Sequence, residues 1–190
     1  MNKEEHIKAT AKEIFFFKGE LHATTQEIAD AAEVNRSLIN YYFRSRDNLF
    51  EIVYNEAVET MVSQLDNVIY SEQPFMDKLE LLIEVYTQEI LKYPYKESFL
   101  ITEICSKNFL LKEKKKSHSL IAFVEDVKKE MEKGTIKKTD PVHFVINLFS
   151  LMAYPIVMAP LYRKLFNLSK EKYQDLLSER KTLIFKLLTE

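Results

Sequence analysis

The segment from residue 36 to residue 43 carries the side chains in this chain that are best suited to reading DNA. At helical spacing, its polar and groove-facing positions are Arg36, Ser37, Leu38, Asn40 and Tyr41. Arginine can bind guanine, and asparagine can bind adenine, through two hydrogen bonds each, and an aliphatic group can contact the thymine methyl. Ile39 and Phe43 lie four residues apart and form a buried, apolar stripe. The pattern predicts a recognition helix held on a small core.

The residues before this segment predict a short helix and a tight turn. Thr24 and Glu27 have the spacing of a capping box, which marks the start of a helix. The chain then turns near Glu33, and Asn35 is a favourable N-cap for the next helix. A first helix over residues 3–18, ended by Gly19, supplies an apolar face to pack against the other two. This order is typical of a helix-turn-helix, which lays the helix after the turn in the DNA major groove.

Three spaced motifs carry a resemblance to a known family. They read Ile-x-x-x-Ala…Phe-x-x-x-Gly, Thr-Thr-x-x-Ile-Ala and Tyr-Tyr-Phe-x-Ser-Arg-Asp-x-Leu, and they fall between residues 7 and 50. Together they resemble the TetR family of bacterial transcription regulators. The resemblance implies that Thr25 contacts phosphate at the start of the second helix. It implies major-groove positions for Arg36, Ser37, Leu38 and Asn40. It implies contacts with the phosphate backbone for Tyr41, Tyr42 and Arg46.

The turn departs from the family pattern at Glu33, where the family usually has glycine. If the backbone at Glu33 adopts a positive φ, the cost is about 1–2 kcal/mol. The turn could instead take a different shape. Ser37 and Asn40 also differ from the residues common in the family, which limits the prediction of the operator sequence rather than of the protein class.

Charge distinguishes selective DNA binding from bulk electrostatic binding. The chain has a formal net charge of −2 and a pI near 6.2, unlike a protein that coats nucleic acid without selectivity. Between Val34 and Arg46, however, the only charged residues are Arg36, Arg44 and Arg46. A local positive surface on a mildly acidic protein suits binding to selected duplex sites.

The rest of the chain predicts helices throughout. Hydrophobic residues make up 46% of the chain, which has only two glycines and five prolines, so we expect an all-α fold. The expected helices cover residues 45–68, 75–92, 97–109, 119–132, 140–166 and 169–188. Residues 1–50 are expected to form the helix-turn-helix DNA-binding domain. Residues 51–190 are expected to form a larger helical domain for effector binding and dimerisation, and the helix over 45–68 would couple the two.

The stretch from residue 142 to residue 161 is long and apolar enough to cross a bilayer, but it contains His143, Asn147, Pro155 and Pro160. We therefore expect no membrane span but a fully buried helix, kinked near Pro155. A helix that is apolar all round needs two covering surfaces, one from its own domain and one from a second subunit.

The last helix carries an apolar stripe near heptad spacing between Tyr173 and Leu188. Packing within one chain would also explain this stripe. The resemblance implies a homodimer through the last two long helices. Such a dimer would place two recognition helices on successive major grooves of double-stranded DNA.

The helices beyond residue 70 are rich in aromatic and methionine side chains. Each of these is most simply a core residue, but together they could enclose an apolar cavity. The resemblance implies a small-molecule effector site here. We expect it to be lined by Tyr86, Phe123, Phe149 and Met152. Cys105, His118 and His143 could add polar contacts, although core or surface roles explain them as well.

Catalysis has little support in the sequence. The histidines are scattered, and no HExxH, CxxC or GxSxG motif and no glycine-rich phosphate loop occurs, so we expect no enzyme activity, metal or cofactor. A single cysteine and the lack of a secretory signal predict a cytoplasmic protein. Two functions stay open. One is a ligand-responsive DNA-binding regulator, most often a repressor in such families; the other is a helical small-molecule or protein-interaction module that no longer reads DNA.

Overall fold

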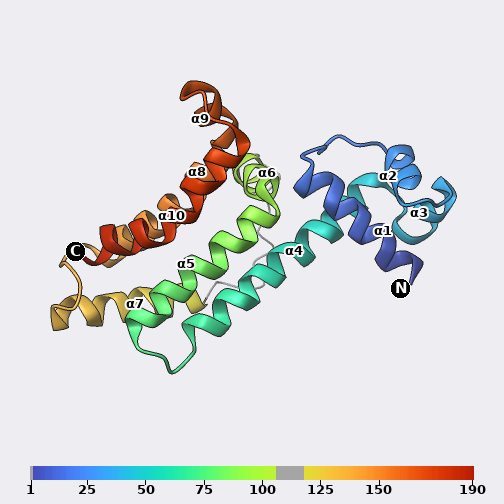
Figure 1. The fold of residues 1–190 in the computed structure, drawn as a ribbon. Helices are drawn as coiled ribbons and strands as arrows, with labels where there is room; N and C mark the ends of the chain where they lie inside the picture. The colour runs from blue at the N-terminus through green and yellow to red at the C-terminus, as the bar shows by residue number, and fades with distance from the viewer. Residues whose placement is uncertain (1, 106–117) are drawn as a thin grey trace.

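The computed structural model describes residues 2–105 and 118–190, which form helices joined by short connections and contain no strand (Figure 1). The helices are α1 (Lys3–Lys12), the π-helix η1 (Glu13–Phe17), α2 (Thr25–Ala31), α3 (Arg36–Phe43), α4 (Arg46–Ile69), α5 (Phe75–Lys92), α6 (Pro94–Cys105), α7 (His118–Lys133), α8 (Pro141–Val157), α9 (Ala159–Leu165) and α10 (Lys170–Thr189). The predicted all-α fold is confirmed. Helix α6 begins three residues earlier than predicted, and the predicted end at residue 109 lies outside the described residues.

Helices α1 to α3 and the first part of α4 pack around one hydrophobic cluster, called here the head. Its most buried large side chains are Ile7, Phe15, Phe16, Ile28, Ile39, Phe43 and Leu49. Gly19 follows η1 with a φ of 80°, so the predicted glycine stop is confirmed. The head is therefore a small unit with its own core.

Helix α4 contributes to two hydrophobic clusters, as expected for the long helix after α3. Its residues up to Ala57 pack in the head, and its residues from Met61 onward pack in a second cluster. The division of the chain at residue 50 stays a prediction, but α4 connects both parts without a flexible linker (Figure 1).

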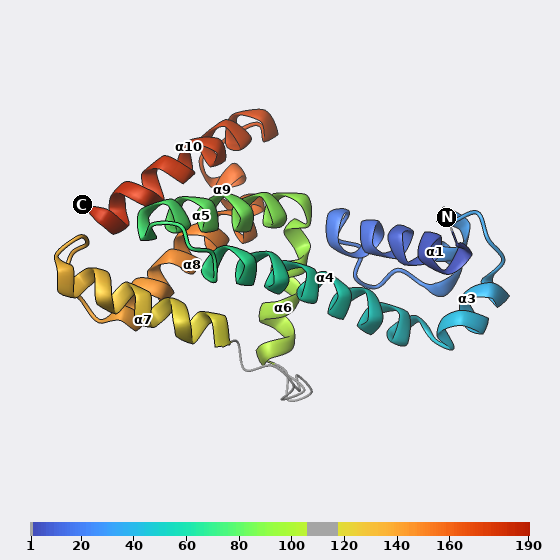
Figure 2. The same ribbon diagram turned by 90° about the horizontal axis from the view of Figure 1, so that it is seen from below.

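Helix α6 begins where α5 ends and runs across α4, where the head meets the rest of the molecule (Figure 2). Two of its aromatic residues, Tyr95 and Phe99, contact the head. The Phe99 ring lies 4.4 Å from the ring of Phe50, measured between centroids. A Cβ atom on Gly19 would lie 2.8 Å from the Tyr95 ring, so only glycine allows this approach. Helix α6 is thus docked against the head by aromatic packing.

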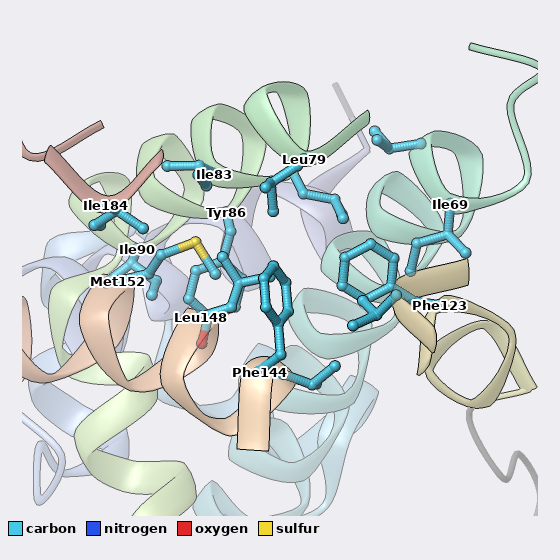
Figure 3. Close-up of a cluster of buried hydrophobic side chains, with 14 of the residues drawn as sticks. Ile69, Leu79, Ile83, Tyr86, Ile90, Phe123, Phe144, Leu148, Met152 and Ile184 are labelled. Atoms are coloured by element: carbon cyan, nitrogen blue, oxygen red, sulfur yellow. The ribbon is translucent and has the colours of Figure 1, made fainter. Parts of the chain in front are cut away.

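The second cluster lies among α4, α5, α7, α8 and α10. Figure 3 shows its side chains converging from these helices. The members that are almost completely shielded from solvent include Leu79, Leu82, Ile83, Ile90, Phe123, Val127, Leu148 and Ile184. This cluster is the core of the larger, C-terminal part of the chain.

The single helix predicted over 140–166 is wrong, because α8 and α9 are separate helices bent by 65°. The predicted kink at Pro155 is also displaced, since Pro155 lies inside α8 and the break comes at Met158. Proline has no N–H to donate to the carbonyl four residues earlier, which belongs to Leu151. That carbonyl accepts a hydrogen bond from Arg180 Nη2 of α10 at 2.9 Å instead. The lost helical hydrogen bond is thereby replaced from outside, and α8 continues past Pro155.

Two further features fix the position of the break. The Tyr173 hydroxyl of α10 donates to the Pro155 carbonyl at 2.6 Å, so this carbonyl needs no donor from a continued helix. Pro160 near the start of α9 also has no N–H for the Ile156 carbonyl. Among the described residues no single helix could cross a bilayer, and only the bent pair α8 and α9 reaches the necessary length and apolarity together.

Helix α8 is buried on one face only, which corrects the expectation of a fully buried helix. Phe144, Leu148 and Met152 face the second cluster, whereas Ile146 and Tyr154 are each 53% exposed. The apolar residues exposed on α8, α9 and α10, or directly after α9, are Val142, Ile146, Tyr154, Leu161, Leu165, Phe166, Leu176, Leu183 and Leu187. The chain's own domain covers one side of α8, as predicted, and leaves the other side open.

Candidate DNA-binding surface and effector region

Helix α2 begins with the predicted capping box. The Glu27 amide donates to Thr24 Oγ1 at 3.2 Å, and the Thr24 amide donates to Glu27 Oε2 at 2.7 Å. The Thr24 hydroxyl also donates to Glu27 Oε2, at 2.8 Å. The two hydrogen bonds that the Glu27 carboxylate accepts from Thr24 lower the pKa of that carboxyl. Thr25 is the first residue of α2 and is half-buried beside this cap. Its position at a helix N-terminus suits the predicted phosphate contact.

The turn between α2 and α3 has a positive φ at Glu33, one of the two possibilities that the sequence left open. The φ of Glu33 is 52°. The Val34 amide donates to the Ala29 carbonyl at 3.0 Å, which closes α2 in a Schellman arrangement. His6 Nε2 lies 3.1 Å from the Ala32 carbonyl, so α1 also holds the turn. The chain forms this turn with glutamate in the place of glycine, at a cost of about 1–2 kcal/mol.

Helix α3 presents the predicted reading face to solvent. Its N-cap Asn35 accepts a hydrogen bond from the Ser37 amide at 2.9 Å. Ile39 and Phe43 are 0% and 1% exposed and fix the helix on the head. The exposed side chains of α3 are Arg36, Ser37, Asn40 and Tyr41, with Leu38 half-buried beside them. This arrangement can enter a major groove, whereas the individual base contacts stay predictions.

The residues predicted to contact phosphate differ in their solvent exposure and in their contacts with the rest of the chain. Tyr41 is 79% exposed, and its ring meets that of the half-buried Tyr42 edge-on at 5.2 Å. Arg46 instead points toward the interior of the head: its Nε donates to the Ala23 carbonyl at 3.2 Å, and its guanidinium lies 5.0 Å from the Phe15 ring centroid. Arg46 therefore holds the start of α4 in place, and a phosphate contact would use the quarter of its side chain that is exposed.

One further arginine lies at this surface. Arg44 is exposed and follows α3 directly, with a φ of 63°. It is absent from the predicted contacts, although the local excess of positive charge between residues 34 and 46 includes it. The excess of positive charge in this segment could therefore have identified Arg44 as part of the candidate surface.

Comparison with known proteins agrees with this geometry. Residues 7–53 match the family model described as bacterial regulatory proteins, tetR family. The N-terminal part of the chain belongs to the TetR family. The comparisons support a transcriptional regulator of that family, which is non-enzymatic.

Relatives of the chain match it over most of their length. The probable HTH-type transcriptional regulator YttP of Bacillus subtilis (strain 168) is 28% identical over 167 residues, which cover 82% of this chain and 77% of YttP. A TetR/AcrR-family regulator from Thermobifida fusca YX-ER1 has a TM-score of 0.68 at 14% identity, covering 97% of each chain. PfmR, a TetR-family regulator from Thermus thermophilus, has a TM-score of 0.64 at 14% identity, covering 98% of this chain and 96% of PfmR. At these identities the two structures show a shared fold.

The four residues predicted to line the effector site all belong to or pack on the second cluster. Tyr86, Phe123 and Met152 are 6%, 1% and 2% exposed, and Figure 3 shows them within that core. The half-buried Phe149 meets the Tyr86 ring edge-on at 5.2 Å. None of these four lines the groove among α8, α9 and α10 or the pocket between α5 and α7. They are packed as core residues, and their contact with a ligand stays a prediction.

A groove of about 930 Å³ lies elsewhere, among α8, α9 and α10. Its walls are mainly apolar and include Tyr154, Tyr162, Phe166, Leu176 and Leu183. Four of these residues are also among the exposed apolar side chains of the C-terminal helices named above: Tyr154, Phe166, Leu176 and Leu183. The groove therefore belongs to the apolar surface that the chain itself leaves open.

Proposed function

We propose that this TetR-family regulator binds a near-palindromic operator in double-stranded DNA as a homodimer and acts as a cytoplasmic repressor. A small apolar or amphipathic effector would release it from the operator. The observation that carries the proposal is the α3 face, where Arg36 and Asn40 are exposed beside the positive Arg44. Side chains of these types at these positions suit base recognition and phosphate contact.

The exposed apolar faces of α8 and α10 support dimerisation through the last two long helices. Large apolar side chains are exposed along both helices, among them Ile146, Leu183 and Leu187. A continuous apolar face of this kind is typical of a protein interface. Pairing about a two-fold axis would present two α3 helices to successive major grooves.

The contact between α6 and the head supports control by an effector. Phe99 and Tyr95 join α6 to the head, while the rest of the C-terminal helices surround the second cluster. A ligand that binds one arrangement of these helices better than another would change the separation of the two heads. This would lower the affinity of the dimer for an operator of fixed spacing.

Selection of bound duplexes from a random pool, at near-physiological salt with competitor DNA, tests the operator proposal. The expected result is enrichment of one near-palindrome. If protein shown to be folded and dimeric enriches no sequence, the operator proposal is wrong and the helical interaction module is favoured. A turn distorted by Glu33 would favour that module, because it would displace α3. The observed turn at Glu33 instead leaves the α3 face exposed, which favours the regulator.

A further inference from the structure

A buried polar cluster lies where α4, α5 and α6 meet. Lys96 is 1% exposed, Glu97 is 5% exposed and Glu89 is 9% exposed. The Lys96 ammonium donates to Glu89 Oε1 at 3.2 Å and lies 3.7 Å from the sulfur of Met61 on α4. Buried charges are costly unless each one is paired and hydrogen-bonded, so a member of this cluster without a complete set of partners would favour the binding of a further group.

Glu97 is the member whose pairing is incomplete. Among the residues that the structure describes, its Oε1 atom is shielded from solvent and has no hydrogen-bond partner. Burial raises the pKa of the Glu97 carboxyl, Lys96 lowers it and Glu89 raises it further. The cluster holds two carboxyl groups for one ammonium, so one more donor with a positive charge would complete it.

The cluster adjoins the aromatic residues expected at the effector site. Tyr86 lies three residues before Glu89 on α5, and therefore on the same side of that helix. Burial and the nearby Glu97 carboxyl both raise the pKa of the Tyr86 hydroxyl. The Tyr86 ring in turn packs against Phe149. Glu97 is thus close to an apolar aromatic wall that an apolar group could contact.

We propose that Lys96, Glu89 and Glu97 form the polar end of the effector site and that they bind the protonated amine of an amphipathic molecule. The amine would donate to Glu97 Oε1, with its apolar part against Tyr86 and Phe149. This inference rests on the proposed effector function and names the chemical class of the ligand.

The chemistry of the cluster discriminates among ligand classes. A carboxylate ligand would face Glu97 and Glu89, because the Lys96 ammonium is already paired. A neutral alcohol could donate to Glu97 but would bring no compensating charge. A hard metal ion would need six or more oxygen ligands, whereas the open position here is a single carboxylate oxygen. An organic ammonium group satisfies both the hydrogen bond and the charge.

The position of the cluster on α6 connects ligand binding to the head. Lys96 and Glu97 lie between Tyr95 and Phe99, the two residues that dock α6 against Gly19 and Phe50. Because Glu97 is a buried residue of α6, we expect a ligand to reach it through a movement of α6. The same movement disturbs the contacts of Tyr95 and Phe99 with the head.

Three probes with one alkyl tail test the proposal: decylammonium, decanol and decanoate, each below its micelle concentration. Binding to the full chain is measured by calorimetry, and operator affinity is measured with and without each probe. We expect decylammonium to bind wild type at least about tenfold more tightly than decanoate and to weaken operator binding. In Glu97→Gln, which keeps the shape of the side chain, this preference for the ammonium probe should be lost.

Glu125→Gln on the exposed face of α7 is the matched control, and it should keep the preference of wild type. Thermal unfolding of each variant verifies that it is folded. Failure of decylammonium to bind, equal binding of the three probes, or an unchanged preference in Glu97→Gln would each overturn the proposal. Operator binding without any probe is a separate measurement, so a failure of the ligand assignment is distinguishable from a failure of the regulator function.

Discussion

The head and the C-terminal helices differ in how completely each one buries its own apolar surface. In the head, the large apolar or aromatic side chains that are strongly exposed are Phe17 and Tyr41, and Tyr41 lies on the α3 reading face. The C-terminal helices expose nine such side chains on or directly next to α8, α9 and α10 alone, of which Leu165 is 66% exposed. The head has the surface of a unit that is complete by itself, and the C-terminal part has the surface of a unit that needs a partner.

The difference has a clear physical meaning. A surface that reads DNA must stay hydrated and polar until it meets phosphate and base edges. A surface that pairs with a second chain gains its stability from apolar burial. The following predictions test whether the two parts of the chain are divided in this way.

The largest effect is expected from Ile146→Glu on the exposed face of α8. In a two-fold dimer this change would bury two unpaired carboxylates, so we expect dimerisation to weaken by about 4 kcal/mol, or roughly a thousandfold. The matched control is Ile121→Glu on α7, where the side chain is 59% exposed. Sedimentation measures both variants, and equal dissociation constants would show that α8 is not the interface.

The next effect is expected from the double variant Arg36→Ala and Asn40→Ala. Each base contact contributes about 1–3 kcal/mol, so operator affinity should fall by about a hundredfold or more. Both side chains are exposed, so the melting temperature should change little. Replacing Lys128 and Asn67 by alanine, at exposed positions away from α3, serves as the control. Retained operator binding by the Arg36 and Asn40 variant would exclude α3 as the reading helix.

A smaller effect is expected from Arg180→Met. This change leaves the Leu151 carbonyl without its donor beside Pro155, so the free energy of unfolding should fall by about 1–3 kcal/mol. Lys172→Met, at an exposed position of α10, should cost much less. Urea denaturation at one fixed protein concentration compares the two, since dimerisation adds to the apparent stability. Equal losses would show that the hydrogen bond to Leu151 contributes nothing specific.

The smallest effect is expected from Glu33→Gly in the turn of the head. Glycine removes a cost of about 1–2 kcal/mol at positive φ but makes the unfolded chain more flexible. The net gain in stability should be about 0.5–1 kcal/mol. Glu59→Gly, in the middle of α4, should instead lose about 1 kcal/mol. Denaturation midpoints measure the change in stability of each variant. A loss of stability in Glu33→Gly would contradict the backbone strain assigned to Glu33.

The sequence predicted best the features that depend on near neighbours. The caps of α2, α3 and α4 each join a side chain to a backbone amide two or three residues away, and a pattern of that length is visible in the sequence. The break between α8 and α9 depends on Tyr173 and Arg180, which lie 18 and 29 residues from the carbonyls they bind. A local rule for proline therefore placed the kink three residues too early.

In the candidate sites, too, the features that depend on near neighbours could be predicted and those that depend on distant residues could not. The face of α3 could be predicted because helical spacing alone separates Asn40 from Ile39. The inward turn of Arg46 could not, because its partners Ala23 and Phe15 come from earlier parts of the chain. Glu97 was also missed, since a glutamate next to a lysine is usually exposed and only the packing of three helices buries it.

The length of α4 sets the scale on which the molecule can act. Its 24 residues form a rigid rod of about 36 Å, fixed at one end in the C-terminal core and at the other in the head. A rod of this length is a lever: a tilt of about 5° displaces its far end by about 3 Å, close to the rise of one base pair. A change near α6 that is too small to disrupt any core could therefore shift a recognition helix by one position along the DNA.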